Sequence, residues 1–358
     1  MYISNYTRYI AEFTTASDKS GQKHLLVIIK ATYRLPLAGE AVGLMTTQLP
    51  LWMADTATGA LGLSAPVYEC DYVLRKPKCD VLLLGAAYAP YGIAAERVAV
   101  GMQVGTLSKA FYVTGKRTWH AGLFGTRPNQ AASFTRQEIS YDVAFGGYEN
   151  SPDNPAERAV YLLNPVGVGF QKKMKSSLIN NMPMPQTEAP ADPITSPKKK
   201  YSPMSFGPLG RSWAQRAKYA GTYGARWEDE VFPFLPADFD DRYFQSAPED
   251  QQLSCLTGGE TVTLLNLTHP ALTPSGRFDF TIPDLTVDVR FYPKRSAAVD
   301  VAARADTLLI EPDQQRFSVT WRVSLPIARS SDEVETVEIS TPSQRRATAA
   351  NQSTGAAV

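Results

Sequence analysis

The sequence predicts a mainly β protein whose antiparallel sheets form a sandwich or a partly closed barrel. Three observations support this fold class. Segments with the alternation of half-buried strands occur near both ends of the chain. Glycines and prolines separate these segments at short spacing. Between them lies a long irregular segment that is rich in aromatic residues and contains one short helix.

The first strands are predicted from runs of β-branched and apolar residues. Residues 25–35 are apolar on both faces near their start, which is typical of a central strand. Residues 79–88 form a second strand. In residues 98–104, valine and methionine alternate with polar or small neighbours, and residues 109–114 repeat the pattern up to a turn at Gly115. These strands are expected to form an antiparallel meander.

Strand patterns return in the last part of the chain, at shorter spacing. Several short strands at such spacing are typical of a sandwich or a barrel. Two of them flank the sequence Glu311 to Arg316, which predicts a hairpin with a longer loop. The predicted strands are centred on residues 262–266, 278–282, 285–291, 307–310 and 317–323.

Two segments are predicted to lie outside the sheets. Residues 181–205 contain six prolines and three consecutive lysines, which favours a semi-extended linker. The chain up to residue 328 is therefore one domain or two β lobes, 1–180 and 206–328, joined by this linker. Residues 329–358 are polar and cannot bury enough apolar surface to order themselves, so we expect a disordered tail.

The central segment, residues 206–253, is too aromatic for a solvated linker and too interrupted by proline for one long helix. A short helix is expected over residues 213–220, with Ser212 as its N-cap and Gly221 closing it in a left-handed conformation. Trp213, Ala217 and Ala220 share the face that is expected to be buried. Irregular segments held by tertiary packing often carry function.

Composition excludes several classes of function. The net charge is +1, which gives no field to attract nucleic acid or an acidic membrane. No apolar run approaches the ~20 residues that span a bilayer, and the first residues do not resemble a signal peptide, so we expect a cytoplasmic protein. Neither the cysteines nor the histidines have the spacing of a disulfide framework or a metal site, so we expect mostly buried, reduced thiols and neither cofactor nor metal. These residues are Cys70, Cys79, Cys255, His24, His120 and His269.

Carboxylates are the best candidates for catalysis. Two of them could face each other across a cleft as general acid and base, with nearby aromatic residues holding a sugar ring. The alternative is that they accept hydrogen bonds from amides of the local turns. The set is Asp238, Asp240, Asp241, Glu249 and Asp250.

Arginine and tryptophan suggest a second kind of site, because both are enriched at the energetic centres of protein interfaces. Arg117 and Trp119 follow a turn glycine and are expected to be exposed. Arg216 and Arg226 either contact a partner or pair with the acidic cluster inside the protein. The predicted partner-binding set is Arg117, Trp119, Arg216, Tyr223, Arg226, Trp227, Asp238, Asp240, Asp250 and Gln251.

Seven segments, in order, resemble those of a bacterial family that is named only as a domain of unknown function. The central one runs from FGPLG at residue 206 through YAGTYGARW and FPFLPADFDDRYF to Gly258-Gly259-Glu260. At two positions the chain departs from the family pattern, with Gly224 in place of an aspartate and Lys116 in place of an acidic residue. The other segments are LVIIKATYRL (26–35), DVLLLGAAYAP (80–90), VTGKRTW (113–119), AFGGYE (144–149), NPVGVGF (164–170) and DTLLIEPDQQRFSVTWR (306–322).

The resemblance implies a non-enzymatic adaptor, or chaperone, of type VI secretion. Members of the family are similar to proteins encoded beside toxic effectors. Such an adaptor would bind the effector, through its PAAR-like amino-terminal region, and help to load it on the VgrG-class spike. Two alternatives remain: a carboxylate-based hydrolase of carbohydrate, which Asp238→Asn or Asp240→Asn would inactivate, and a carbohydrate-binding module, which a glycan array would reveal.

Overall fold

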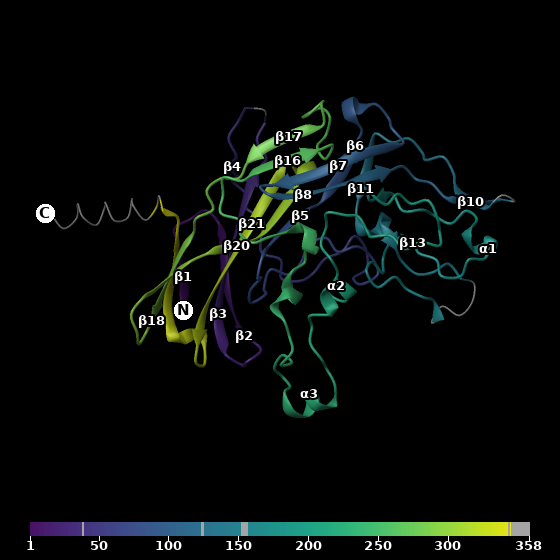
Figure 1. Cartoon of the computed structure of the whole chain (residues 1–358). Coiled ribbons are helices and arrows are strands. Elements are labelled where there is room, and N and C mark those ends of the chain that lie inside the picture. The colour runs from purple at the N-terminus through teal and green to yellow at the C-terminus, as the bar shows by residue number, and fades with distance from the viewer. Residues whose placement is uncertain (38, 123–124, 152–156, 343, 345–358) are drawn as a thin grey trace.

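A computed structural model describes residues 1–37, 39–122, 125–151, 157–342 and 344. The protein is mainly β, as predicted, and its sheets are mostly antiparallel and not closed into a barrel. Three larger sheets and three two-stranded pairs make up the body (Figure 1). Strands from both ends of the chain lie side by side in the larger sheets, which was also predicted.

The largest sheet has seven strands. β3, which corresponds to the predicted central strand, lies between β2 and β21 and is buried on both faces. β20 and β21 form the predicted hairpin, and a short 3-10 turn, Pro312–Gln314, connects them. The strands are β15 (Gln252–Leu253), β5 (Cys79–Leu83), β20 (Arg304–Glu311), β21 (Arg316–Ile327), β3 (Lys23–Arg34) and β2 (Ile10–Ser17), in this order, and β4 (Gly43–Leu44) also pairs with β3.

A second sheet has five strands and joins distant parts of the sequence. β7 and β8 are the predicted meander strands, and alternate residues of β7, from Val98 to Val104, are buried. The other edge of β7 pairs with β16 from the last third of the chain. The order is β14 (Thr187–Glu188), β8 (Leu107–Thr114), β7 (Arg97–Val104), β16 (Thr261–Leu265) and β17 (Arg277–Thr281).

The third sheet corrects the predicted tail. The disorder expected for residues 329–358 is wrong for Val334–Ser340, which form strand β22. Val334, Val337 and Ile339 are buried, while the glutamates and the threonine between them are not, so the strand packs on the core despite its polar composition. Residues 343 and 345–358 lie outside the described residues. The order in this sheet is β1 (Tyr2–Asn5), β22 (Val334–Ser340), β18 (Asp288–Pro293) and β19 (Val299–Ala302).

Short elements complete the fold. The predicted strand 79–88 is two strands, because the chain passes from β5 into a separate pair, β6 with β11. No helix in the described residues is long and apolar enough to cross a membrane. The remaining elements are β6 (Gly85–Tyr88), β11 (Arg136–Ile139), β9 (Trp119–Gly122), β10 (Gly125–Pro128), β12 (Phe145–Gly146), β13 (Val168–Gly169), α1 (Ser176–Ile179), α2 (Ala214–Ala217) and α3 (Ala225–Glu230).

One large core draws on all three sheets. Alternate residues of β3, such as Val27 and Ile29, pack in it together with residues of β7 and β18. The sheets therefore do not follow the two lobes 1–180 and 206–328. The proposed linker, residues 181–205, is not a solvated spacer either, because Met182, Met184, Ile194 and Tyr201 are buried in a second cluster around Trp119.

Buried charges attach the irregular central segment to the seven-stranded sheet. Asp80 on β5 is fully buried, lies 2.7 Å from Lys76 and accepts a 2.8 Å hydrogen bond from the Ser246 amide. Lys76 also faces Glu69 at 3.6 Å, and Arg216 pairs with Glu69 at 2.5 Å. Burial alone would raise the pKa of Glu69, but Arg216, Lys76 and Arg211 outweigh it and lower that pKa.

Two adjacent glycines offer a matched test of the packing. Both Gly258 and Gly259 have positive φ, but a Cβ on Gly258 would lie 2.3 Å from the Pro283 carbonyl oxygen, whereas one on Gly259 would meet nothing within 4 Å. We expect Gly259→Ala to lower the free energy of unfolding by about 1 kcal/mol. Gly258→Ala should cost about 3 kcal/mol or more, because the backbone must also move. Urea denaturation of both variants measures this difference, and equal losses would contradict the close approach.

Candidate partner-binding surface

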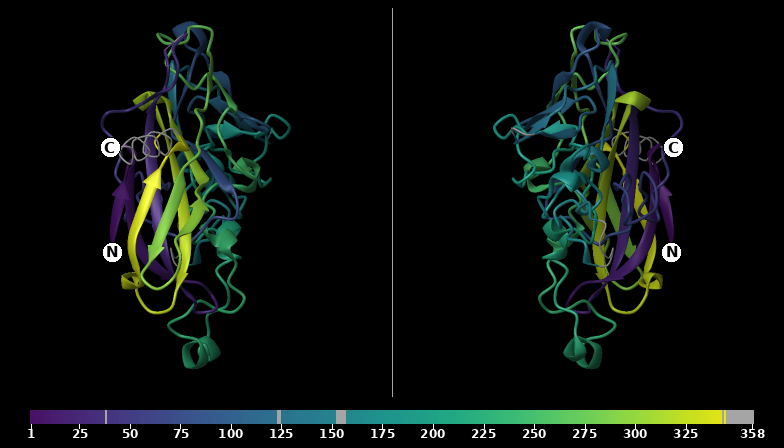
Figure 2. Two further views of the ribbon diagram at one scale, coloured as in Figure 1. Left: turned by 90° about the vertical axis from the view of Figure 1, so that its left-hand side faces the viewer. Right: turned by 90° about the vertical axis from the view of Figure 1, so that its right-hand side faces the viewer.

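Residues 222–237 form an arm that projects from the body and carries α3 at its far end (Figures 1 and 2). No helix was predicted for these residues. α3 begins after the extended Gly224, contains good helix formers and ends at Glu230, three residues before Pro233. Its aromatic neighbours are exposed, with Tyr223 at 52%, Phe232 at 66% and Phe234 at 47% of full exposure. Clustered exposed apolar side chains are typical of interaction sites.

The aromatic residues of the arm pack on one another. The Trp227 ring lies 4.8 Å from the Tyr223 ring and 5.5 Å from the Phe232 ring, in edge-to-face geometry. The Trp227 indole nitrogen donates a 2.9 Å hydrogen bond to the Phe234 carbonyl. These contacts hold the surface in one arrangement before any partner binds. None of these four residues belongs to a core cluster among the described residues.

The arm is closed at its base by a carboxylate. Asp238 accepts hydrogen bonds from the Thr222 amide at 2.9 Å and from the Thr222 hydroxyl at 2.7 Å, and these bonds lower its pKa. Gly221 has φ +83°, as predicted for a left-handed residue, and a Cβ there would lie 2.9 Å from Pro236. The two ends of the arm therefore meet at a fixed neck.

The turn between β2 and β3 supports one side of the arm. Phe234 lies over Gly21 of this turn, where a Cβ would be 3.6 Å from the phenyl ring. Lys19 donates a 3.2 Å hydrogen bond to the Phe239 carbonyl just beyond the neck. Asp18 shapes the turn by accepting hydrogen bonds from the Ser20 hydroxyl and amide.

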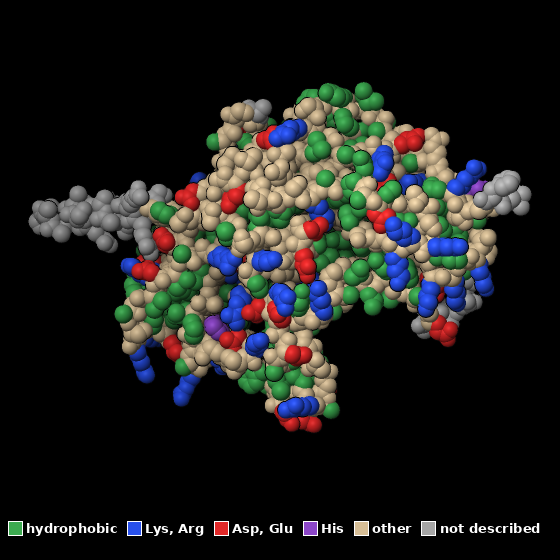
Figure 3. Space-filling view, in the orientation of Figure 1, with side chains coloured by type: hydrophobic (Ala, Val, Ile, Leu, Met, Phe, Trp, Pro, Cys, Tyr) green, Lys and Arg blue, Asp and Glu red, His purple; other side chains and the backbone are tan. Residues whose placement is uncertain are grey.

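The end of the arm is acidic. Arg226 pairs with Glu230 one turn further along α3, at 2.9 Å, and both side chains are exposed. Within the described part of the chain, Glu228 and Asp229 have no ion-pair partner. Figure 3 shows this charged end below a patch of apolar side chains on the arm. The arm thus combines an aromatic surface with uncompensated negative charge.

Each of the other predicted carboxylates has a basic partner, and Asp240 and Asp241 directly follow the neck in sequence. Asp240 pairs with Arg242 at 2.6 Å, and Asp241 pairs with Arg75 at 2.7 Å. The Arg242 side chain lowers the pKa of Asp240, which is opposite to the shift that a general acid needs. Glu249 lies near Lys218 at 3.4 Å, and Asp250 pairs with Lys109 at 3.1 Å.

A family model described as an uncharacterized protein conserved in bacteria (DUF2169) matches residues 20–322. The chain belongs to this family. No match was found among curated proteins or among solved structures. The match spans six of the seven strands of the largest sheet in part or in full, as well as the whole arm, whereas β1 and β22 lie outside it.

Four predicted contact residues of this DUF2169 protein are internal. The exposure expected for Arg117 and Trp119 is wrong. Trp119 fills the second core cluster, and Arg117 is mostly covered and pairs with Glu188 at 2.8 Å. Glu188 in turn binds Arg97 at 3.1 Å. The glycine turn before Arg117 therefore leads into the protein and not to its surface.

Arg216 and Gln251 are also buried. Arg216 pairs with Glu69 and donates to the carbonyls of Leu209 and Tyr243 at 2.9 and 2.8 Å, so it is internal, but its partner is not in the predicted acidic cluster. Gln251 donates to the carbonyls of Val81 and Phe206. A partner that binds the folded protein does not reach either side chain. Of the predicted set, the arm brings together Tyr223, Arg226 and Trp227, with Asp238 and Asp240 at its base and Asp250 further away.

The predicted helix 213–220 is shorter than expected. α2 covers Ala214–Ala217, Trp213 precedes it with extended backbone, and Ser212 makes no capping hydrogen bond. Its buried residues are Trp213 and Arg216, whereas Ala217 is exposed. The helical pattern of apolar residues did not predict this buried face, because its position 216 is an arginine whose charge is paired with Glu69.

Neither the carboxylates nor the histidines and thiols form a metal site in the described residues, because no group of three or more His, Cys, Asp or Glu is arranged there to hold a metal ion. His24 faces Asp18 at 3.2 Å. The three cysteines are free, but only Cys79 is buried, so the expected burial of the thiols is wrong for Cys255, which is exposed.

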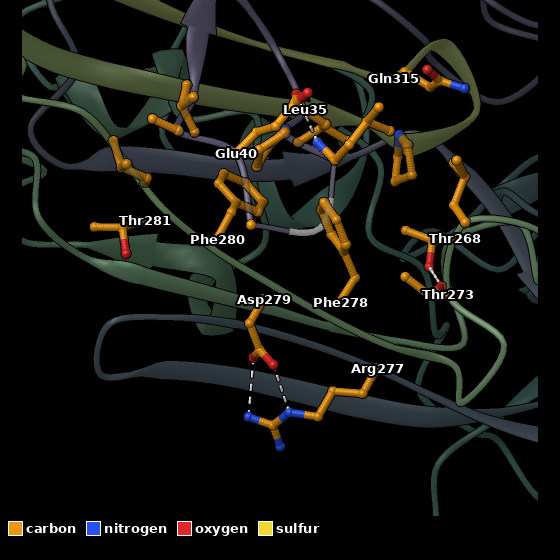
Figure 4. A pocket seen from close by; sticks show the side chains of 18 of the residues that line it. Leu35, Glu40, Thr268, Thr273, Arg277, Phe278, Asp279, Phe280, Thr281 and Gln315 are labelled. Carbon is orange, nitrogen blue, oxygen red and sulfur yellow. Dashed lines mark hydrogen bonds and ion pairs between the residues drawn. The ribbon is translucent and has the colours of Figure 1, made fainter.

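One surface feature was missed by sequence reasoning. A groove of about 760 Å³ lies beside β17, where Phe278 and Phe280 point toward the loop that follows Leu35 (Figure 4). Phe278 and Phe280 belong to the predicted strand 278–282, which corresponds to β17. The groove also needs the loop that follows Leu35, which is far from β17 in the sequence, so no local sequence pattern predicts it.

The separation of the arm from the core predicts unequal effects of two tryptophan substitutions. Trp213→Ala should lower the free energy of unfolding by about 3 to 5 kcal/mol, because Trp213 is buried against Tyr141. Trp227→Ala should change it by less than about 1 kcal/mol. Denaturation in urea, followed by circular dichroism, measures both. A comparable loss in the two variants would show that the arm is part of the cooperative core.

The turn beneath the arm predicts a pH dependence. The Ser20 hydroxyl, the His24 ring and two backbone amides lower the pKa of Asp18 to about 2, against some opposition from burial. Because this pKa is lower in the folded than in the unfolded protein, the carboxylate stabilises the fold above pH ~4 and loses this effect as the pH falls toward ~2. The stability difference between wild type and Asp18→Asn should shrink over that range. A difference that stays constant would contradict the low pKa.

Proposed function

We propose that this chain is a cytoplasmic adaptor that binds a toxic effector of type VI secretion and helps to dock it on the VgrG-class spike. The partner segment is the PAAR-like amino-terminal region of the effector. One observation carries the proposal: a projecting arm presents the exposed rings of Tyr223, Phe232 and Phe234 as a preformed aromatic cluster around the half-buried Trp227. The resemblance of the sequence segments supplies the class of partner.

The arm suits binding because its aromatic rings offer a large apolar area at low entropic cost. A buried aromatic side chain removes about 150 to 250 Å² from water. The ring contacts of Trp227 and its hydrogen bond to the Phe234 carbonyl already restrict the side chains. A partner therefore gains most of the burial energy without having to order the surface.

The charge of the arm defines the partner site further. Glu228 and Asp229 are exposed beside the aromatic cluster, while Arg226 is neutralised by Glu230. The complementary surface is an apolar groove rimmed by lysine or arginine. Such a charge arrangement accelerates encounter at low ionic strength and disfavours acidic competitors.

The proposed mechanism is binding without turnover. The adaptor covers an apolar surface of the effector before assembly and releases it when the spike forms the more stable complex, so no nucleotide is consumed. The carboxylates around the neck support this role over acid catalysis. Asp238 and Asp240 have lowered pKa values; Asp238 accepts hydrogen bonds from Thr222 that close the arm, and Asp240 accepts from Arg242 beside it.

Binding to the product of the adjacent toxin gene tests the proposal. The two proteins should co-purify, and the abundance of the toxin should fall when the adaptor is absent. Trp227→Ala should weaken the affinity at least about tenfold in calorimetric titration, because it removes the centre of the aromatic cluster. Replacing Glu228 and Asp229 by lysine should slow association and reverse its salt dependence.

The matched control is Tyr2→Ala, since Tyr2 is a similarly exposed aromatic residue on β1, far from the arm. It should leave the affinity unchanged. Lack of co-purification together with unchanged toxin abundance would reject the proposal. Binding to a glycan array without affinity for the toxin would favour the carbohydrate-binding module instead.

A further inference from the structure

The groove beside β17 is a second surface, at the opposite end of the body from the arm (Figure 1). Its floor and walls are mainly apolar. Phe278 and Phe280 face it from β17, and Leu35 and Pro36 face it from the loop after β3 (Figure 4). Leu272 contributes from the preceding turn and is partly exposed at 39%. The volume, about 760 Å³, is enough for several side chains.

β17 is an edge strand with an open side. It pairs with β16 alone in the described sheet. Ile282 donates to the Glu260 carbonyl, and the Gly276 carbonyl accepts from Asn266, so the even-numbered residues of β17 direct their backbone groups toward β16. Antiparallel pairing alternates, and Arg277, Asp279 and Thr281 therefore direct their N–H and C=O groups to the open side. Such an edge is a template for another strand.

The charges at the groove cancel one another. Only three residues of its lining are charged. Arg277 pairs with Asp279 at 2.8 Å, and Glu40 pairs with Arg34 at 2.7 Å. A charged ligand side chain would have to break one of these pairs or enter the apolar cavity unpaired, and either costs free energy. Charge complementarity therefore selects an uncharged occupant.

We propose that this groove binds an extended, uncharged segment of a partner protein as an additional strand beside β17. The N–H and C=O groups of Arg277, Asp279 and Thr281 pair with the backbone of the segment. Alternate side chains of the segment enter the apolar cavity over Phe278 and Phe280, while the others face solvent. The five residues of β17 offer about 17 Å of edge, the length of a typical strand.

This site goes beyond the proposed function and does not require the arm. Because the two surfaces lie at opposite ends of the molecule, one adaptor can hold a segment at each of them simultaneously. A protein with both surfaces can join two partners, or two distant segments of one partner, and simultaneous engagement raises the overall affinity.

Selection from a library of random short peptides tests the site in the full-length protein. Selected sequences should be uncharged and carry apolar residues at alternate positions. Thr281→Pro should weaken their binding at least about tenfold, because it removes an outward N–H group without removing a hydrogen bond to β16. The matched control Thr281→Val keeps the N–H group and should bind normally. Leu272→Glu places a charge at the exposed lining and should also cost at least about tenfold.

The outcomes separate the possible occupants. Selection of charged peptides, or of none that bind at the groove, overturns the proposal. Loss of binding with Leu272→Glu but not with Thr281→Pro indicates an apolar ligand that does not pair with the strand. A wild-type dimer that Thr281→Pro converts to a monomer indicates a second copy of the chain as the occupant. Urea denaturation of each variant confirms that the fold is retained, and none of these results depends on whether a toxin binds the arm.

Discussion

The position of the arm depends on a buried carboxylate, Asp80, in the seven-stranded sheet. A charge in the protein interior must be paired, and here its partners come from the irregular segments that cross β5. Lys76 also forms an ion pair with Glu69, and Glu69 forms one with Arg216 of α2. α2 leads within a few residues to the neck. A chain of ion pairs therefore gives a segment with little regular structure a defined orientation, from which exposed aromatic side chains can be presented to a partner.

The sequence predicted the strands well where one face is buried, because alternation is then forced by the geometry of the strand. β7 follows this rule, whereas β3, β20 and β21 are buried on both faces and were predicted from their apolar and β-branched residues. β22 was missed although Val334, Val337 and Ile339 are all buried, since the average polarity of the last residues concealed their spacing. The composition of a segment gives only its average polarity, whereas a strand can be held by the burial of a few individual residues. The assumed linker failed for the same reason, as four apolar residues among its prolines are enough to anchor it.

The candidate site was predicted only in part. Tyr223 and Trp227 were predicted because the density of aromatic residues is unusual for an irregular segment, whereas the exposed Phe232 and Phe234 were not in the predicted set. Arg117, Trp119, Arg216 and Gln251 were not distinguishable from contact residues, because arginine and tryptophan have the same features in an interface and in a core. The difference lies in partners such as Glu69 and Glu188, which come from distant parts of the chain. The β17 groove is likewise formed by two segments that only the folded chain brings together.

The pairing of β3 with β21 has a consequence for the synthesis of this protein. β3 is buried on both faces, and its full-length partner β21 follows it in the chain only after all the strands from β4 to β20. Until β21 is synthesised, one edge of β3 has no partner strand, and most of the residues that bury β3 in the folded protein are absent. Non-local pairing of this kind folds slowly and exposes intermediates to aggregation. β3 therefore stays at risk of aggregation until β21 pairs with it.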